Sequence, residues 1–166
     1  KLKLNLLDLN KLIQEVLELY ETTNTTEDTL HSYIRLALTP NLPPIKGDST
    51  RLRQVIHNLL QNSQDTLVDI PEPIINVSTE IVQDGICLSL SDNGKGFPDH
   101  VIMRAFEPYV TTKIKGTGLG LPIVKKIVEE HNGTIKIGNI QPHGAYIAIT
   151  LPAISENDST ITREIT

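Results

Sequence analysis

The sequence predicts an α/β (α+β) two-layer sandwich, in which a mixed, mostly antiparallel sheet is covered on one face by three main helices. Three segments carry apolar residues at helical spacing, and six shorter segments are apolar or alternate between apolar and polar residues like strands. Two pairs of these strands are separated by only a few turn residues, which favours antiparallel pairing.

The composition predicts one domain. A chain of 166 residues with 39% apolar content can bury one core, so we expect a domain over residues 1–153 and a polar tail over residues 154–166. Its single cysteine, Cys87, excludes an internal disulfide and is expected at a buried strand position. The net charge of −5 argues against a nucleic-acid binder. No apolar run reaches the roughly 20 residues that span a bilayer, so we expect no direct membrane contact by this domain.

The first third of the chain predicts a strand, a helix and a second strand. Residues 2–6 alternate like a short strand, and Asp8 or Asn10 can cap a helix that ends near Glu21. A polar loop then leads to a strand over residues 32–38. The apolar positions of the helix are Leu9, Leu12, Ile13, Val16, Leu17 and Tyr20.

The second helix is the clearest in the sequence. Asp48 or Ser49 caps it, and it ends before Pro71. Its apolar face consists of Leu52, Val55, Ile56, Leu59, Leu60 and Leu67.

The second half of the chain predicts two strand pairs around a third helix. Strands are expected over residues 74–82 and 86–92, joined by a tight turn, and over residues 134–140 and 145–152. The helix is expected over residues 117–131.

Half of the ten glycines lie within 27 residues, at Gly94, Gly96, Gly116, Gly118 and Gly120. The last three directly precede the third helix, whose free N–H groups and positive dipole end favour phosphate. The segment from Arg104 to Lys126 carries five basic residues and one acidic residue, a local charge of +4 that suits a small polyanion. The dinucleotide fingerprint is excluded because Leu121 stands where it needs glycine, and no P-loop sequence occurs. Simple turns are the alternative interpretation of each glycine.

Two polar patterns predict ligand contacts. Asp92 lies at the exit of a strand, where its carboxylate can accept a hydrogen bond from an exocyclic amine such as that of adenine; an Asx-turn is the alternative. Asn58 and Asn62 stand one turn apart on the second helix, where asparagine is a poor helix former. Their amide oxygens suit a magnesium ion whose other ligands are water and phosphates. They share a polar stripe with Gln54, Gln61 and Asp65.

Together these segments resemble the catalytic and ATP-binding domain of sensor histidine kinases, within the superfamily of gyrase, Hsp90 and MutL. The similarity covers nearly the whole chain and rests on four motifs in order: QVIHNLLQNSQD, SDNGKGFP, AFEPYVTTK and KGTGLGLPIVKKIVEEHNGTI. The third motif and the short segment after it resemble the nitrogen-regulation type of sensor kinase. The resemblance implies a Bergerat-type ATP-binding fold. Gly144 and Ala145 are a thin version of the family's last glycine motif.

The resemblance also implies roles for residues. Asn62 would be the magnesium ligand, Asp92 would bind the adenine amine, and Asn58 and Lys113 would be catalytic. The ATP-binding residues that it implies are Asn58, Asn62, Asp65, Asp92, Gly94, Gly96, Phe97, Thr112, Lys113, Gly116, Thr117, Gly118, Leu119 and Gly120.

The implied activity is transfer of the γ-phosphoryl group of ATP, with Mg²⁺, to a histidine on a helical hairpin of the same protein. None of the five histidines of this chain is followed by an acidic residue, as the family's acceptor is, so the acceptor domain is expected outside it. A response regulator is the further expected partner. We expect a cytoplasmic domain, and leave open whether the longer protein is anchored to the inner membrane.

Two other functions are alternatives. An ATPase of the gyrase, Hsp90 or MutL type would need a glutamate as general base one turn before the magnesium ligand, but that position is Asn58, and no glutamate occurs between Gly47 and Pro71. Phosphoryl transfer, which relies on positioning and charge neutralisation, is therefore favoured. A nucleotide sensor without transfer activity is the second alternative.

Overall fold

The computed structural model describes residues 2–23, 33–83, 85–104 and 120–154. Its main element is a five-stranded sheet in the order β2-β4-β5-β7-β6. The strands β2 and β4 are parallel, and every other neighbouring pair is antiparallel. The bounds are β2 Ile34–Leu38, β4 Ile75–Val82, β5 Gly85–Asp92, β6 Thr134–Asn139 and β7 Ala145–Pro152.

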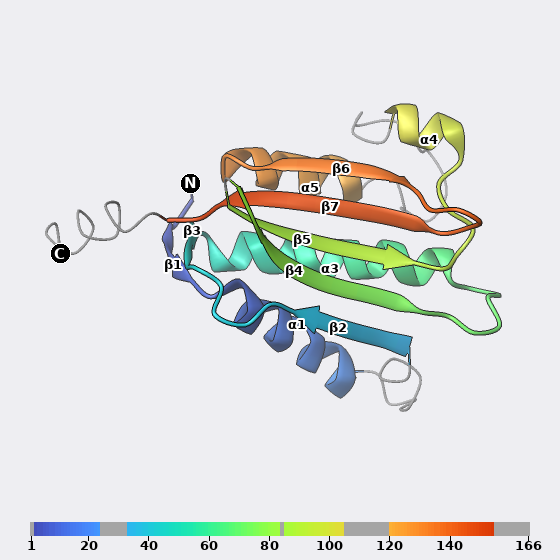
Figure 1. The fold of residues 1–166 in the computed structure, drawn as a ribbon, viewed down its shortest axis with the longest axis horizontal. Helices are drawn as coiled ribbons and strands as arrows, with labels where there is room; N and C mark the ends of the chain where they lie inside the picture. Colours follow the sequence, from blue (N-terminus) through green and yellow to red (C-terminus); the bar gives the residue numbers. More distant parts are fainter. Residues whose placement is uncertain (1, 24–32, 84, 105–119, 155–166) are drawn as a thin grey trace, which may run out of the picture.

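Three long helices, α1 (Leu9–Thr23), α3 (Ser49–Thr66) and α5 (Gly120–Glu130), cover one face of this sheet (Figure 1). Their apolar faces are buried because they meet the inward side chains of the strands, such as Ile75, Leu90 and Ile149. The predicted two-layer sandwich is therefore confirmed. The helices α3 and α5 pack side by side, which sets the geometry of the site described below.

Asp48 caps α3, as predicted. Its Oδ1 accepts hydrogen bonds from the backbone N–H groups of Thr50 at 3.1 Å and Arg51 at 3.2 Å. At the other end of the helix, Leu67 is the C-cap. Asp8, the first of the two predicted caps, accepts from the Lys11 N–H at 3.2 Å at the start of α1. The second candidate, Asn10, instead donates to the Thr39 carbonyl at 2.7 Å.

Two short elements were not expected. The strand β3 (Ile45–Gly47) pairs with β1 (Asn5–Leu7) in a separate two-stranded sheet, and the short helix α4 (Asp99–Arg104) follows the second glycine of the SDNGKGFP motif. The C-terminal strand continues toward this small sheet, because Ala153 bridges Ile45 and the Ile154 N–H donates to the Pro44 carbonyl at 3.1 Å.

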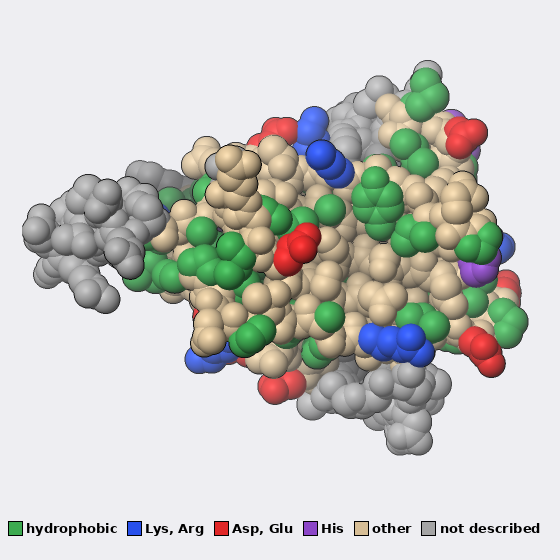
Figure 2. All heavy atoms as spheres, in the orientation of Figure 1, with side chains coloured by type: hydrophobic (Ala, Val, Ile, Leu, Met, Phe, Trp, Pro, Cys, Tyr) green, Lys and Arg blue, Asp and Glu red, His purple; other side chains and the backbone are tan. Residues whose placement is uncertain are grey.

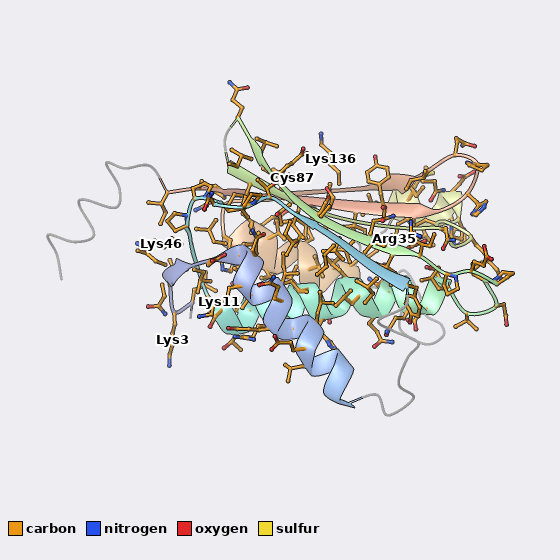
Figure 3. The ribbon with its side chains drawn as sticks, turned by 60° about the horizontal axis from the view of Figure 1, so that its bottom comes forward. Lys3, Lys11, Arg35, Lys46, Cys87 and Lys136 are labelled. Carbon is orange, nitrogen blue, oxygen red and sulfur yellow. The ribbon has the colours of Figure 1, made fainter. Side chains whose placement is uncertain are left out.

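The other face of the five-stranded sheet carries no helix among the described residues, and only a few charged side chains are scattered over it (Figure 2). Cys87 lies on this face, as does Lys136 (Figure 3). Cys87 is only half-buried, so the prediction of a buried position was wrong. The neighbours of Cys87 in β5 are apolar and buried. Successive side chains of a strand point to opposite faces, so the Cys87 side chain points away from the core. Within the described residues, no helix is long and apolar enough to cross a bilayer.

Candidate nucleotide-binding site

A small pocket lies at the end of the sheet where both α3 and β5 have their C-terminal ends. It has an apolar floor from the sheet and a polar rim from the last turns of α3, as small-molecule sites commonly have. The residues that line it are Asn62, Ser63, Thr66, Leu90, Asp92, Phe97, Ala145, Tyr146 and Ile147.

Asp92 is held by backbone donors through one of its two oxygens. Oδ1 accepts hydrogen bonds from the N–H of Gly94 at 2.9 Å and from the N–H of Ala145 at 3.4 Å. The bond to Gly94 is the Asx-turn that the sequence offered as an alternative. The Thr66 hydroxyl lies 3.4 Å from Oδ2, which is a long hydrogen bond, and Ser63 also donates to the carboxylate. The turn therefore occupies one oxygen and leaves acceptor capacity on the other.

Burial raises the pKa of Asp92, and the hydrogen bonds from Gly94, Ala145, Thr66 and Ser63 oppose that rise. The side chain is buried, at 7% exposure, and no Lys or Arg side chain is recorded as its ion-pair partner within the described ranges. A hydrogen-bond donor that enters the pocket would stabilise the ionised form of this buried carboxylate.

Asn62 is the second buried polar group of the pocket. It is 7% exposed, and its Nδ2 has no hydrogen-bond partner in the part of the chain that the structure describes. Such buried atoms usually have a protein, water or ligand partner. Rotation about the last side-chain bond exchanges the amide N and O, so Asn62 can present either atom.

The first residue of α5 lies against this amide. A Cβ added at Gly120 would be 3.7 Å from both amide atoms of Asn62 and 3.7 Å from the Cβ of Asn58. The N-terminus of α5, where a helix has N–H groups without partners inside the helix, therefore meets the asparagine pair of α3.

The Asn62 amide fits a magnesium ion whose other ligands are phosphate oxygens and water. Among the described residues, no group of three or more His, Cys, Asp or Glu side chains could hold a metal ion. An all-protein site is therefore not formed there. The Asn62 amide offers a hard oxygen, and Mg²⁺ commonly takes few protein ligands and completes its shell with water and phosphate oxygens.

Glycines let the loop after β5 pass close to its neighbours. A Cβ at Gly94 would lie 2.7 Å from the Thr66 carbonyl oxygen, and one at Gly144 only 2.2 Å from the Asp92 carbonyl oxygen. Gly144 also has φ of 131°, a region that favours glycine. Gly144, from the last glycine motif, is therefore the residue that the close approach to the Asp92 carbonyl requires to be glycine.

Seven residues of the predicted set lie at or next to the pocket. Gly94 and Gly96 belong to the loop between Asp92 and Phe97, and the others are Asn58, Asn62, Asp92, Phe97 and Gly120. Asp65 is exposed on α3 and accepts a hydrogen bond from Gln61 at 3.3 Å, so it does not line the pocket. Six further predicted residues lie outside the described residues: Thr112, Lys113, Gly116, Thr117, Gly118 and Leu119.

Sequence reasoning missed several pocket residues. Thr66 was not singled out, although it follows Asn62 by four positions and so continues the same helix face. Tyr146 and Ile147 arrive from a distant strand, and only the sheet pairing of β5 with β7 places them beside Asp92. No local pattern indicates that contact.

A family profile described as "Histidine kinase-, DNA gyrase B-, and HSP90-like ATPase" matches residues 47–155. This chain belongs to that family. The match contains α3, the loop after β5 and the N-terminus of α5, and so the whole of the pocket described above. The chain is a nucleotide-using domain of the type found in two-component sensor kinases, as the four motifs predicted.

Curated relatives of this histidine kinase-like domain are longer sensor proteins. The sensor histidine kinase ZraS of Escherichia coli O157:H7 is 37% identical over 153 residues, which are 91% of this chain and 32% of that protein. The nitrogen regulation protein NtrY of Azorhizobium caulinodans is 38% identical over 120 residues, 69% of this chain and 16% of that protein. The chain thus spans about a third or less of these relatives.

Solved structures of histidine kinases share the fold. The catalytic domain of histidine kinase ThkA matches with a TM-score of 0.75 and 29% identity, covering 91% of this chain and 96% of that one. ThkA in complex with the response regulator TrrA matches with a TM-score of 0.74 and 26% identity, covering 92% and 42%. Full-length ShkA in complex with AMPPNP matches with a TM-score of 0.72 and 26% identity, covering 93% and 32%.

Proposed function

We propose that the pocket binds the adenine of ATP and that Asp92 accepts a hydrogen bond from the exocyclic amine of the base. The observation that carries this proposal is the unequal use of the Asp92 oxygens, because two backbone N–H groups donate to Oδ1, whereas the Thr66 hydroxyl lies 3.4 Å from Oδ2 in a side chain that is 7% exposed. The apolar floor of Leu90 and Ile147 suits a flat base. The AMPPNP complex of ShkA, a protein with the same fold, supports a nucleotide in this domain.

We also propose that the Asn62 amide oxygen binds Mg²⁺, with Asn58 beside it, and that the N-terminus of α5 faces the phosphates. When bound, the metal neutralises phosphate charge and fixes the phosphate geometry. With the amide rotated so that its oxygen takes the position of the unpartnered Nδ2, the metal would supply the partner that this position lacks among the described residues. Lys113 remains a proposed γ-phosphate contact from the sequence.

The proposed reaction breaks the bond between the γ-phosphorus and the bridging oxygen of ATP, releases ADP, and forms a phosphorus–nitrogen bond on a histidine of a helical-hairpin domain outside this chain. A response regulator is the proposed receiver of the group, as the ThkA–TrrA complex suggests by analogy. We propose that the domain acts in the cytoplasm.

Calorimetry with ATP tests the metal site. Asn62→Ala should weaken binding of ATP with Mg²⁺ by about tenfold or more, because a metal ligand is lost. The matched control is Gln61→Ala, an exposed neighbour on the same helix. Without Mg²⁺, the difference in ATP affinity between the wild type and Asn62→Ala should be much smaller. Equal affinities in the presence of Mg²⁺ would remove Asn62 from the metal site.

A transfer assay with labelled ATP tests the reaction. The chain should label a supplied helical-hairpin domain that carries a histidine, and should neither label itself nor hydrolyse ATP rapidly when alone. Rapid hydrolysis by the isolated chain would support the ATPase alternative. Tight nucleotide binding without any transfer would support a nucleotide sensor.

A further inference from the structure

Asn139, the last residue of β6, uses its whole side-chain amide to hold the backbone of one residue of the pocket. The Phe97 N–H donates to Asn139 Oδ1 at 2.7 Å, and Asn139 Nδ2 donates to the Phe97 carbonyl at 2.8 Å. The side chain thus takes the place of a backbone partner in a strand ladder. Its orientation is fixed, because the reversed amide would set donor against donor and acceptor against acceptor.

Gly96 allows this clamp to form. Its φ is 81°, and a Cβ there would lie 2.9 Å from Asn139 Oδ1 and 3.0 Å from the Gly144 carbonyl oxygen. Any larger residue would push the loop away from Asn139. This glycine of the SDNGKGFP motif is therefore required by the approach of β6, and not only by the approach of a ligand.

The turn after β6 holds the other end of the same loop. His143 Nδ1 lies 2.9 Å from the Asn93 carbonyl, to which it must donate because a carbonyl only accepts. The Ala145 N–H donates to Asp92. Together, Asn139, His143 and Ala145 fix the segment from Asp92 to Phe97 at both ends.

We propose that Asn139 is a positioning residue for the nucleotide base. It acts through Phe97, which lines the pocket together with Asp92. The proposal rests on the proposed adenine site. Without the clamp, the loop beyond Gly94 loses both hydrogen bonds that hold the Phe97 backbone to the sheet, and the base loses a wall at a fixed distance from Asp92.

The test measures affinities for adenosine, by NMR titration, and for ADP, by calorimetry. Asn139→Ala should weaken both by the same factor, about tenfold for two lost hydrogen bonds. Asn76→Ala, at an exposed asparagine of β4, is the matched control and should change neither. The second variant is Asn139→Asp, which keeps the acceptor for the Phe97 N–H but sets an oxygen against the Phe97 carbonyl. It should also bind adenosine more weakly at neutral pH.

A double-mutant cycle separates positioning from a general loss of structure. Phe97→Leu should cost less affinity in the Asn139→Ala background than in the wild type, because an unclamped Phe97 already contributes less. Thermal unfolding of each apo variant verifies that it is folded. Wild-type affinity in both Asn139 variants, a loss for ADP but not for adenosine, or additive effects of Asn139 and Phe97 would each overturn the proposal. A wild type that binds neither ligand would instead refute the adenine site itself.

Discussion

The two oxygens of Asp92 have different tasks. Oδ1 organises the loop, because two backbone N–H groups donate to it, whereas Oδ2 has a long contact of 3.4 Å to the Thr66 hydroxyl. The sequence offered the Asx-turn and the adenine contact as alternatives. The geometry shows that the turn does not exhaust the carboxylate, so both can hold at once.

Replacing Asp92 by asparagine should separate stability from binding. The Asp92→Asn side chain keeps an oxygen for Gly94 and Ala145, but its second atom is a nitrogen that donates and cannot accept from an amine. We expect adenosine and ATP to bind about 10- to 100-fold more weakly, since a hydrogen bond to a charged group is lost. Calorimetry measures this, with Asp99→Asn as the control at an exposed aspartate of α4.

The same variant should be more stable than the wild type at neutral pH. Burial raises the folded-state pKa of Asp92, so the cost of its ionised form is fully present above that pKa and is relieved as the pH falls through it. Urea unfolding without nucleotide should therefore give a higher free energy of unfolding for Asp92→Asn at pH 7. The advantage should shrink as the solution is acidified. A less stable variant at pH 7 would contradict this account of the burial cost.

At the scale of elements, the long periodic helices and the alternating strands, including the short β1, were predictable, whereas β3 and α4 were not. The face of α3 and its Asp48 cap could be inferred because one repeating pattern and one local hydrogen-bonding rule define them. The strand β3 has three residues and the helix α4 six, too few for either period to be visible. The strand β3 exists because β1 pairs with it, which no local signal records.

The candidate site shows the same division. Asn58, Asn62 and Asp92 carry their signal in their own segments, as a helix spacing and a strand exit. Asn139 has no such signal, because its role depends on the 2.7 and 2.8 Å contacts to Phe97, 42 positions away. Residues that position others across a sheet are therefore found only from the structure.

Gly120 should tolerate alanine as far as the fold is concerned. A Cβ there would meet Asn58 and Asn62 at 3.7 Å, an ordinary contact, whereas one at Gly133 would lie 2.4 Å from the Thr150 carbonyl. Gly120 is the first residue of α5, where glycine has less advantage or penalty relative to alanine than in a helix interior. We expect Gly120→Ala to keep the thermal midpoint, while its methyl group beside the Asn62 amide weakens binding of ATP with Mg²⁺.

Gly133→Ala is the comparison for this prediction, and it should lower the midpoint because the clash is with backbone. Thermal unfolding and calorimetry on the two variants measure both effects. If Gly120→Ala bound ATP with Mg²⁺ as tightly as the wild type, the N-terminus of α5 would not face the phosphates.

At the scale of the whole molecule, Asp48 joins three distant segments, because it caps the start of α3, which lies at the opposite end of the sheet from the end of β5 (Figure 1). Its Oδ2 accepts from the Lys3 N–H at 2.9 Å, and its own N–H donates to His131 Nε2 at 3.0 Å. His131 is buried, and its Nδ1 donates to the Ile127 carbonyl at 2.8 Å, which fixes one tautomer. The segment before β1, the cap of α3 and the residue that follows α5 therefore share one network.

This network should make the stability of the domain depend on pH through Asp48. The Lys3 N–H is the largest cause of its lowered pKa, so the stabilisation is fully present above the ordinary value of 3.8 and is lost as the pH falls through the folded-state pKa. Urea unfolding should show Asp48→Asn less stable than the wild type at pH 7, with the difference shrinking in acid. Lys3→Pro, which removes the N–H donor, should abolish most of that pH dependence, whereas Lys3→Ala, which removes only the side-chain charge, should retain it. If the two Lys3 variants behaved alike, the backbone bond between β1 and the α3 cap would not be the source of the effect.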